Sequence, residues 1–251
     1  MKTSVLALLA ALAPGAGAEV LPEALPAPDK PGVSGGLGAA LTGGSGGYGR
    51  VAVYGDALWL GDSVSPYAWT EYGTDSDARR FSLGGGAWKE LSEALRFKGG
   101  LGFSVGRFRA ADAGSNSVTF ETGLERDLER PTVGAEYRRT AGSIGGSTAT
   151  RGGQRVGQGQ LRGRAAAGTA AVSERFSYDE LSGYARLPAG AATVGLRAAV
   201  GFPSYGSAIV SETLSGSVPL SGPLAARLAV SFEQGARAAV YASGGLDYRF
   251  E

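Results

Sequence analysis

The chain has 251 residues, of which 43 are glycine, and it contains neither cysteine nor histidine. These absences exclude disulfides, thiolate nucleophiles, serine–histidine catalytic pairs and histidine-containing zinc sites. The 24 basic and 23 acidic residues balance one another, whereas a nucleic-acid-binding protein is expected to have a basic excess. We therefore expect no nucleic-acid partner, no metal, no cofactor and no enzymatic activity.

Residues 1–18 have the pattern of a secretory signal peptide. Lys2 supplies the positive charge, an apolar run from Val5 to Ala13 follows, and small residues precede an expected cleavage point after Ala18. The run is too short for a membrane-spanning helix, which needs about 20 apolar residues. Residues 19–32 contain four prolines and are expected to form an extended periplasmic lead-in: Pro22, Pro26, Pro28 and Pro31.

From Val33 onward, apolar residues alternate with small or polar ones, which is typical of strands with one apolar and one wet face. The clearest internal example runs from Leu95 to Gly106. A short segment at 67–72 is also expected to be a strand, but its facing cannot be assigned. Glu212 falls on the apolar face of its segment and is therefore expected near a rim. The other alternating segments are 33–42, 50–59, 81–91, 118–125, 132–138, 194–202, 210–220 and 224–232.

The last alternating segment, Ala238 to Phe250, ends in a polar-x-Gly-x-x-aromatic-x-aromatic pattern. It resembles the C-terminal strand of bacterial outer-membrane β-barrel proteins, where this pattern is the assembly signal. Glu251 departs from the family, which usually ends at the aromatic residue. The four positions of the signal are Ser243, Gly245, Tyr248 and Phe250.

The resemblance implies an all-β, antiparallel, porin-like transmembrane β-barrel over residues 33–251. Its partners would be outer-membrane lipid and lipopolysaccharide, the barrel assembly machinery and periplasmic chaperones. A secreted β-sandwich is the main alternative, but its strands would be about 5–6 residues long. The segments here are closer to the ~9–11 residues that cross a bilayer.

The connections favour about twelve strands. Tight turns at 91–94, 126–131, 188–190 and 221–223 contrast with longer connections at 107–117 and 141–153. This contrast places short turns and both termini on the periplasmic side. The count of twelve requires 141–171 to be one long external loop. It rises to fourteen if 154–170 forms a hairpin, and falls to ten if 67–72 and a neighbour are not strands.

Two features at the ends of the barrel follow from this arrangement. The expected long loop carries Arg151, Arg155, Arg162 and Arg164, which suit anionic lipopolysaccharide. Aromatic residues are expected in two interfacial girdles. One girdle lies at the short-turn end and the other at the long-loop end: Trp59, Tyr67, Trp69, Tyr184, Tyr248 and Phe250, and then Tyr72, Phe81, Phe202 and Phe232.

The wet face carries the candidate functional residues. Many of its positions are small, so twelve strands leave room for a water-filled lumen, and opposed charges would act on passing solutes. This pattern favours a small passive pore for polar solutes. The alternative is a non-conducting structural or surface-interaction barrel, in which the charges form salt bridges across the lumen. The candidates are Arg96, Lys98, Glu121, Glu125, Glu136, Arg138, Arg197, Arg227, Glu233, Asp247 and Arg249, with Arg50 and Asp56 on the same face.

The terminal signal yields a direct test. Replacing Phe250 by Ala removes an apolar anchor and part of the signal, so the yield of folded barrel in outer-membrane fractions should drop sharply. Folded barrel is measured by its shift in electrophoretic mobility on boiling. Phe232→Ala, which lies outside the signal, is the control and should assemble normally. Normal assembly of Phe250→Ala would show that the terminal pattern is coincidental.

Overall fold

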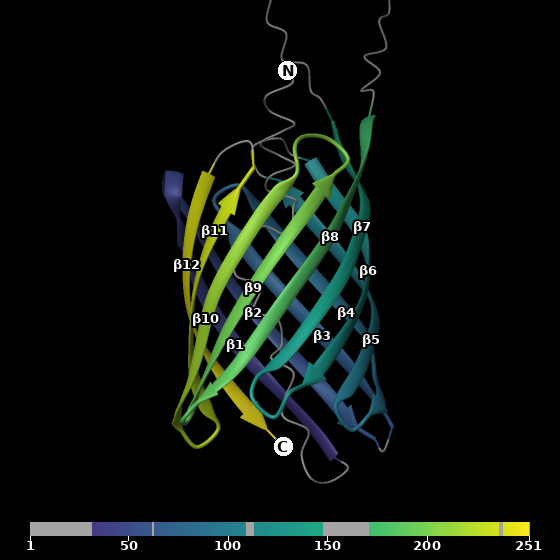
Figure 1. The fold of residues 1–251 in the computed structure, drawn as a ribbon. Coiled ribbons are helices and arrows are strands. Elements are labelled where there is room, and N and C mark those ends of the chain that lie inside the picture. Colours follow the sequence, from purple (N-terminus) through teal and green to yellow (C-terminus); the bar gives the residue numbers. More distant parts are fainter. Residues whose placement is uncertain (1–31, 62, 109–112, 148–170, 236–237, 251) are drawn as a thin grey trace, which may run out of the picture.

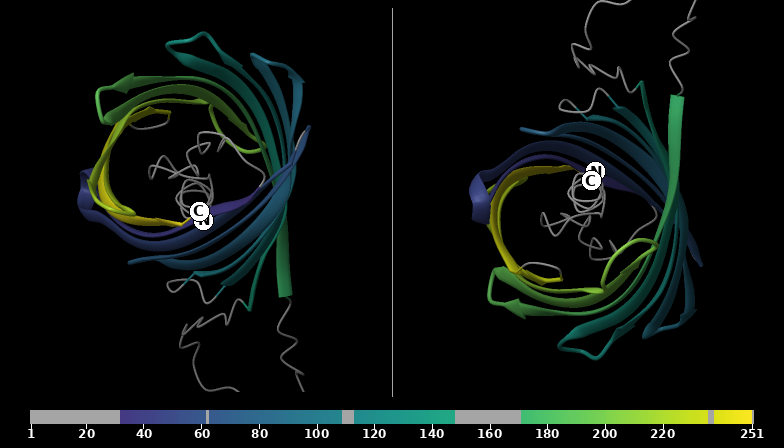
Figure 2. Two further views of the ribbon diagram at one scale, coloured as in Figure 1. Left: turned by 90° about the horizontal axis from the view of Figure 1, so that it is seen from below. Right: turned by 90° about the horizontal axis from the view of Figure 1, so that it is seen from above.

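The computed structural model describes residues 32–61, 63–108, 113–147, 171–235 and 238–250. Within these ranges, twelve antiparallel strands form a closed barrel in which each strand pairs with its neighbours in sequence and β1 also pairs with β12 (Figures 1 and 2). The all-β class and the strand number are therefore confirmed. The strands are β1 (Gly32–Gly44), β2 (Tyr48–Leu60), β3 (Val64–Asp75), β4 (Ala78–Ser92), β5 (Leu95–Phe108), β6 (Ala113–Asp127), β7 (Thr132–Ser147), β8 (Ala171–Ala189), β9 (Ala192–Pro203), β10 (Ile209–Ser221), β11 (Leu224–Gln234) and β12 (Ala238–Phe250).

Some strands are longer than the alternation indicated. The expected connection at 107–117 is largely strand, because β5 continues to Phe108 and β6 begins at Ala113. The segment expected at 67–72 is the middle of β3, and β7 runs on to Ser147. These extensions contain Ser, Asn and Gly, which still pair through their backbones but lack the apolar face that made the other segments recognisable. The possible hairpin at 154–170 lies outside the described residues.

Short connections occur at both ends of the barrel, since two residues also join β3 to β4. β1 begins and β12 ends at the same end (Figure 1). That end also holds the two-residue turns after β8 and β10, where Gly190 and Gly222 have φ values of 68° and 53°. A positive φ at the first position of such a turn matches the twist of the paired strands. The prediction that both ends of the barrel domain lie at the short-turn end is confirmed.

A short 3-10 turn, η1 (Ser45–Gly47), joins β1 to β2 at the opposite end. Among the described residues, no helix is long and apolar enough to cross a membrane.

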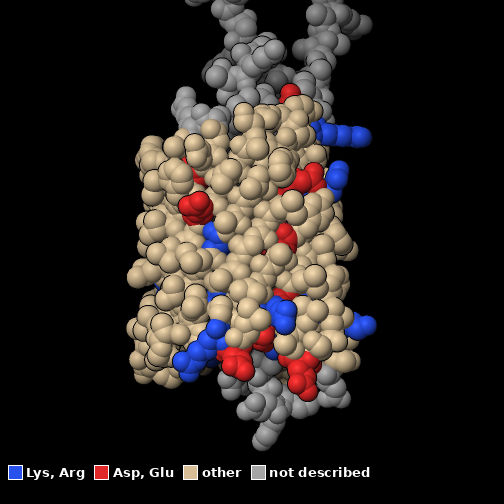
Figure 3. Space-filling view, in the orientation of Figure 1, with Lys and Arg blue, Asp and Glu red and all other residues tan. Residues whose placement is uncertain are grey.

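The outward face of the sheet is apolar. Large apolar side chains are exposed there on every strand except β7, whose outward positions include Ala135, Arg139 and Ala141. Leu228 of β11 is 70% exposed. Figure 3 shows one side of this surface, on which most of the area carries no charge. Glu212 interrupts the face opposite Phe232, close to the start of β10 at the long-loop end. Its expected position near a rim is confirmed.

The girdle prediction is wrong for three aromatic residues. Trp59, Tyr72, Phe81, Phe202, Phe232, Tyr248 and Phe250 are exposed on the outward face. Tyr67, Trp69 and Tyr184 instead point inward, where they lie against glycines of neighbouring strands. A Cβ atom at Gly84 would lie 2.7 Å from the Trp69 ring, and one at Gly134 would meet the Tyr184 ring. Part of the high glycine content therefore makes room for inward-facing rings.

The two faces should tolerate charge differently. Leu228→Arg places a cation in the exposed apolar band of β11 and should lower the free energy of unfolding by about 2–4 kcal/mol near the bilayer midplane. Ala229→Arg, one residue further along and facing inward, should cost much less. Urea unfolding of the refolded barrel in lipid vesicles measures both. Gly102→Arg is unsuitable as an inward-facing control, because Trp69 covers Gly102. Equal destabilisation at positions 228 and 229 would contradict the assignment of faces.

Candidate pore lining

The inward face is polar, and its side chains meet across strands that are not neighbours. The Tyr67 hydroxyl of β3 donates a hydrogen bond to Glu121 of β6 at 2.5 Å, and Lys98 of β5 lies 3.5 Å from Glu136 of β7. Side chains from strands two or three apart converge in this way only on the concave side of a barrel. The polar face therefore lines the interior.

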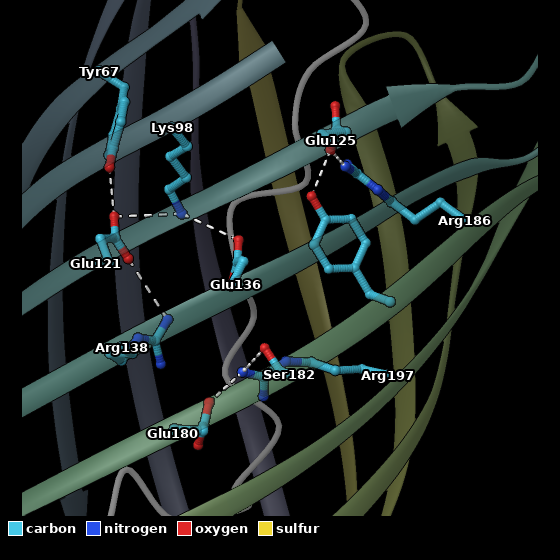
Figure 4. Close-up of polar contacts among 11 residues, drawn as sticks. Tyr67, Lys98, Glu121, Glu125, Glu136, Arg138, Glu180, Ser182, Arg186 and Arg197 are labelled. Carbon is cyan, nitrogen blue, oxygen red and sulfur yellow. Dashed lines mark hydrogen bonds and ion pairs between the residues drawn. The ribbon is translucent and has the colours of Figure 1, made fainter. Parts of the chain in front are cut away.

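Lys98 is the centre of one of two large charged clusters. Its ammonium lies 3.3 Å from Glu121 and 3.5 Å from Glu136, and Arg138 approaches Glu121 at 3.7 Å (Figure 4). The same ammonium lies 5.6 Å from the centre of the Tyr67 ring and 5.7 Å from that of Trp88, distances at which a cation is attracted to an aromatic face. Lys98 is only 8% exposed, so two carboxylates and two rings replace much of its water.

A second cluster surrounds Glu125, which is only 2% exposed. Its carboxylate pairs with Arg186 of β8 and accepts a hydrogen bond from the Tyr184 hydroxyl at 2.8 Å (Figure 4). Arg96 of β5 approaches it at 3.6 Å and also contacts Asp127 at 3.2 Å. Glu125 thus joins β5, β6 and β8 on the inner wall.

Three smaller groups complete the charged lining. Arg197 of β9 donates to Glu180 of β8 at 2.5 Å and to the Ser182 hydroxyl at 3.2 Å. Asp247 of β12 pairs with Arg227 of β11 and accepts a hydrogen bond from Tyr54 of β2. Arg50 pairs with Glu71 between β2 and β3. Each pair joins opposite charges from different strands, as a buried charge requires.

All eleven lining candidates lie on this inward face, and nine of them belong to the groups above. The remaining two lie outside these groups of side chains. Arg249 lies near the short-turn end of β12, on the same face as Asp247, and Glu233 lies near the long-loop end of β11.

Sequence reasoning missed several members of these clusters. Glu180 and Arg186 share a face of β8 with Phe176, Tyr178 and Tyr184, so the inward face of that strand looks apolar or aromatic in sequence. Glu180, Ser182 and Arg186 are separated by even numbers of residues, and this spacing is the one signal that places them on a shared polar face. Tyr67 was not expected among the lining residues, because it was expected in the girdle at the short-turn end. Tyr54 shares the inward parity of Arg50 and Asp56, but its contact with Asp247 was not predictable.

The wall opposite the charged clusters is mostly small and uncharged. The middle positions of β10, β11, β12 and β1 carry hydroxyl, methyl or hydrogen side chains, and Thr213 and Ser231 share a hydrogen bond of 2.9 Å. The inward positions that make up this small-residue wall are Ser211, Thr213, Ser215, Ser217, Ala225, Ala229, Ser231, Ser243, Gly245, Gly36 and Ala40. Gly38 also faces inward, but the Tyr54 ring and the Asp247 carboxylate lie over it. Within the described ranges, no group of acidic residues is placed to hold a metal ion.

No protein-family model and no curated protein matches the sequence. The fold is similar to that of solved outer-membrane barrels. The NanC porin matches with a TM-score of 0.60 and 9% identity, over 84% of this chain and 98% of that one. The KdgM porin, solved in complex with disordered oligogalacturonate, matches with a TM-score of 0.56 and 10% identity, over 86% and 99%. The translocator domain of the autotransporter NalP from Neisseria meningitidis matches with a TM-score of 0.59 and 14% identity, over 88% and 90%.

At these identities the likeness establishes the fold. The chain has the closed antiparallel barrel of outer-membrane porins and autotransporter translocators, which is the architecture that the terminal strand predicted.

The Glu125 cluster should be a major contributor to stability. Glu125→Ala leaves Arg186 without its carboxylate partner in a nearly water-free position, and breaking a buried pair in this way costs about 3–5 kcal/mol. Glu90→Ala is the control, because Glu90 contacts Arg96 only at 3.9 Å with a half-exposed side chain. Such exposed pairs contribute about 0–1 kcal/mol. Urea unfolding of both refolded variants measures the difference, and similar losses would contradict the burial of Glu125.

Proposed function

We propose that the protein is a small passive pore for polar solutes in the bacterial outer membrane. Its fold is that of porins, its outward face suits lipid, and its inward face is polar. The observation that carries the proposal is the uneven lining. The largest charged clusters lie on β5 to β8, whereas β10 and the middle of β11 and β12 carry small neutral side chains, with the Arg227–Asp247 pair towards the short-turn end.

The size of the barrel determines how much space the small-residue wall leaves in the lumen. Twelve strands spaced about 4.8 Å apart and tilted by roughly 40° enclose a backbone cylinder of about 12 Å radius. Serine, alanine and glycine on one side of that cylinder occupy little of its width. Water and solutes would therefore pass between the small-residue wall and the charged clusters.

The charges predict weak selectivity between small ions. Arg197 and Arg227 each pair with a carboxylate, and Asp247 is 3% exposed. Paired charges on one wall largely cancel at a distance, so neither cations nor anions are strongly favoured. Reversing either arginine would also disrupt the wall, which makes these two positions poor probes of selectivity.

Export and assembly belong to the same proposal. Cleavage after Ala18 would release a chain whose residues 19–32 lead from the periplasm into β1, and lipopolysaccharide would surround the long-loop end. Tyr248 and Phe250 are exposed on the outward face, and the Phe250 ring lies over Gly35 where β12 meets β1. That position at the closing seam suits residues read by the assembly machinery. The arginines of the expected long loop, from Arg151 to Arg164, lie outside the described residues.

One observation favours the second candidate, a non-conducting barrel with a salt-bridged interior. The clusters around Lys98 and Glu125 connect β5, β6, β7 and β8, and the side chains at their centres are buried. Such a network stabilises a wall whether or not solutes pass beside it. Conductance of the purified barrel distinguishes the two candidates.

The small-residue wall offers the sharpest test of the pore. Ser215 faces inward near the middle of β10, opposite Gly195 and Ala229. Ser215→Lys and Ser215→Glu introduce opposite charges at one place without breaking an ion pair. In a salt gradient across a planar bilayer, the lysine variant should shift the reversal potential towards anion preference and the glutamate variant towards cation preference.

The paired variants control for each other, because both lengthen the same side chain. A wild-type barrel that folds but does not conduct would favour the non-conducting candidate. Conductance with the same reversal potential in both variants would show that solutes do not pass along this wall.

A further inference from the structure

An aromatic ring lies against the inner wall above the Lys98 cluster. The indole of Trp69 extends from β3 across two glycines, so that a Cβ atom at Gly84 would lie 2.7 Å from the ring and one at Gly102 would lie 3.1 Å from it. Trp69 faces inward and is only half-buried, so part of the indole is exposed to the interior.

Polar groups surround this ring on the same level of the barrel. Asp56 of β2 is the direct cross-strand partner of Trp69. Within the part of the chain that the structure describes, its carboxylate forms no hydrogen bond or ion pair within the usual distances, although the charges of Arg249 and Arg227 act on it. On the far side of Gly102, the hydroxyls of Thr119 and Thr140 lie 2.9 Å apart.

Hydroxyl groups also lie above the ring, and a charged group lies below it. Ser104 donates a hydrogen bond to Ser82 at 2.9 Å on the adjoining strands. The Tyr67 ring lies beside Trp69 over Gly86 and Gly100, with its hydroxyl on Glu121. The arrangement is a flat apolar face bordered by acceptors and donors.

We infer that Trp69 is a stacking platform for the ring of an uncharged sugar that enters the lumen. This inference rests on the proposed function, because the sugar must reach the interior. The face of an indole is electron-rich, and the axial C–H groups on one face of a pyranose carry a small positive charge. The hydroxyls of such a ring point outward from its edge, towards Asp56, Thr119 and Thr140. Few ordered polar groups around an apolar surface are what fixes a small ligand.

Other solutes fit this place less well. An anion would be repelled by Asp56. A small cation could lie on the indole beside Asp56, but it would make no use of the hydroxyl donors of Thr119 and Thr140. A flat aromatic solute could stack on the indole but would leave the surrounding hydroxyls and the carboxylate without partners. A polyhydroxylated ring can stack on the indole and also form hydrogen bonds with the polar groups around it.

The test uses the refolded full-length mature barrel in planar bilayers, with maltose as the probe. Maltose should reduce the ionic current saturably, whereas sorbitol, which has no rigid ring, should not at equal concentration. Trp69→Leu keeps an apolar cover over Gly84 and Gly102 but has no aromatic face. It should raise the half-saturating maltose concentration about tenfold, and Trp69→Phe should lie between the two.

The matched control is Tyr72→Ala, which lies on the outward face of the same strand and should leave the maltose block unchanged. Trp69→Leu with an unaltered block would overturn the inference, as would a conducting wild type that maltose does not block. Block by phenol but not by maltose would overturn it in favour of an aromatic solute.

A second readout separates this inference from the pore itself. The chain has three tryptophans, so Trp59→Phe combined with Trp88→Phe leaves Trp69 as the only indole. Absence of conductance would refute the proposed pore, and the fluorescence of that variant would still decide binding. A saturable change with maltose but not sorbitol supports the platform, and no saturable change refutes it.

Discussion

The closing of the sheet between β1 and β12 is the constraint on which the rest of the structure depends. In hydrocarbon, each unsatisfied backbone donor or acceptor costs several kcal/mol, so a spanning sheet cannot keep an open edge. Residues Gly35 to Gly44 pair with Tyr241 to Phe250 in unbroken register. Once this seam is closed, every strand has one side towards lipid and one towards an enclosed space. Alternate residues of each strand therefore face lipid and the interior.

The enclosed space accounts for the composition. Twelve strands surround more volume than an apolar core could fill, so the inner face is polar, and the charges that are buried in the wall are stabilised by pairing. Lys98 with Glu121 and Glu136, and Glu125 with Arg186, meet that requirement. The glycines opposite Tyr67, Trp69 and Tyr184 let rings lie against the wall instead of standing into the lumen. In the proposed pore, polar passage and a stable wall therefore come from different sides of the same barrel.

The sequence predicted the class, the strand number and the position of the ends of the barrel, because most outward faces are apolar. Strands β5 and β12 were recognisable for this reason. β8 was not, since Phe176 and Tyr178 are buried inside while Ser177 and Asp179 face outward. Which charges meet could not be predicted, because the pairing of Lys98 with Glu136 depends on the register of three strands and on the curvature of the wall. The side of the sheet on which a charge lies can be predicted from its odd or even position in the strand. The contacts that it makes depend on how the barrel closes.

The central claim is that the inner face borders water while the outer face borders lipid. The chain has no cysteine, so single cysteines introduced at neighbouring positions can be probed without background. Ser215→Cys and Leu214→Cys differ by one residue on β10 and face opposite ways. In the folded barrel in lipid vesicles, a small charged thiol reagent should modify the cysteine at position 215 and should reach position 214 only after unfolding. Protection at position 215 until unfolding, or equal reactivity at both positions, would contradict the account.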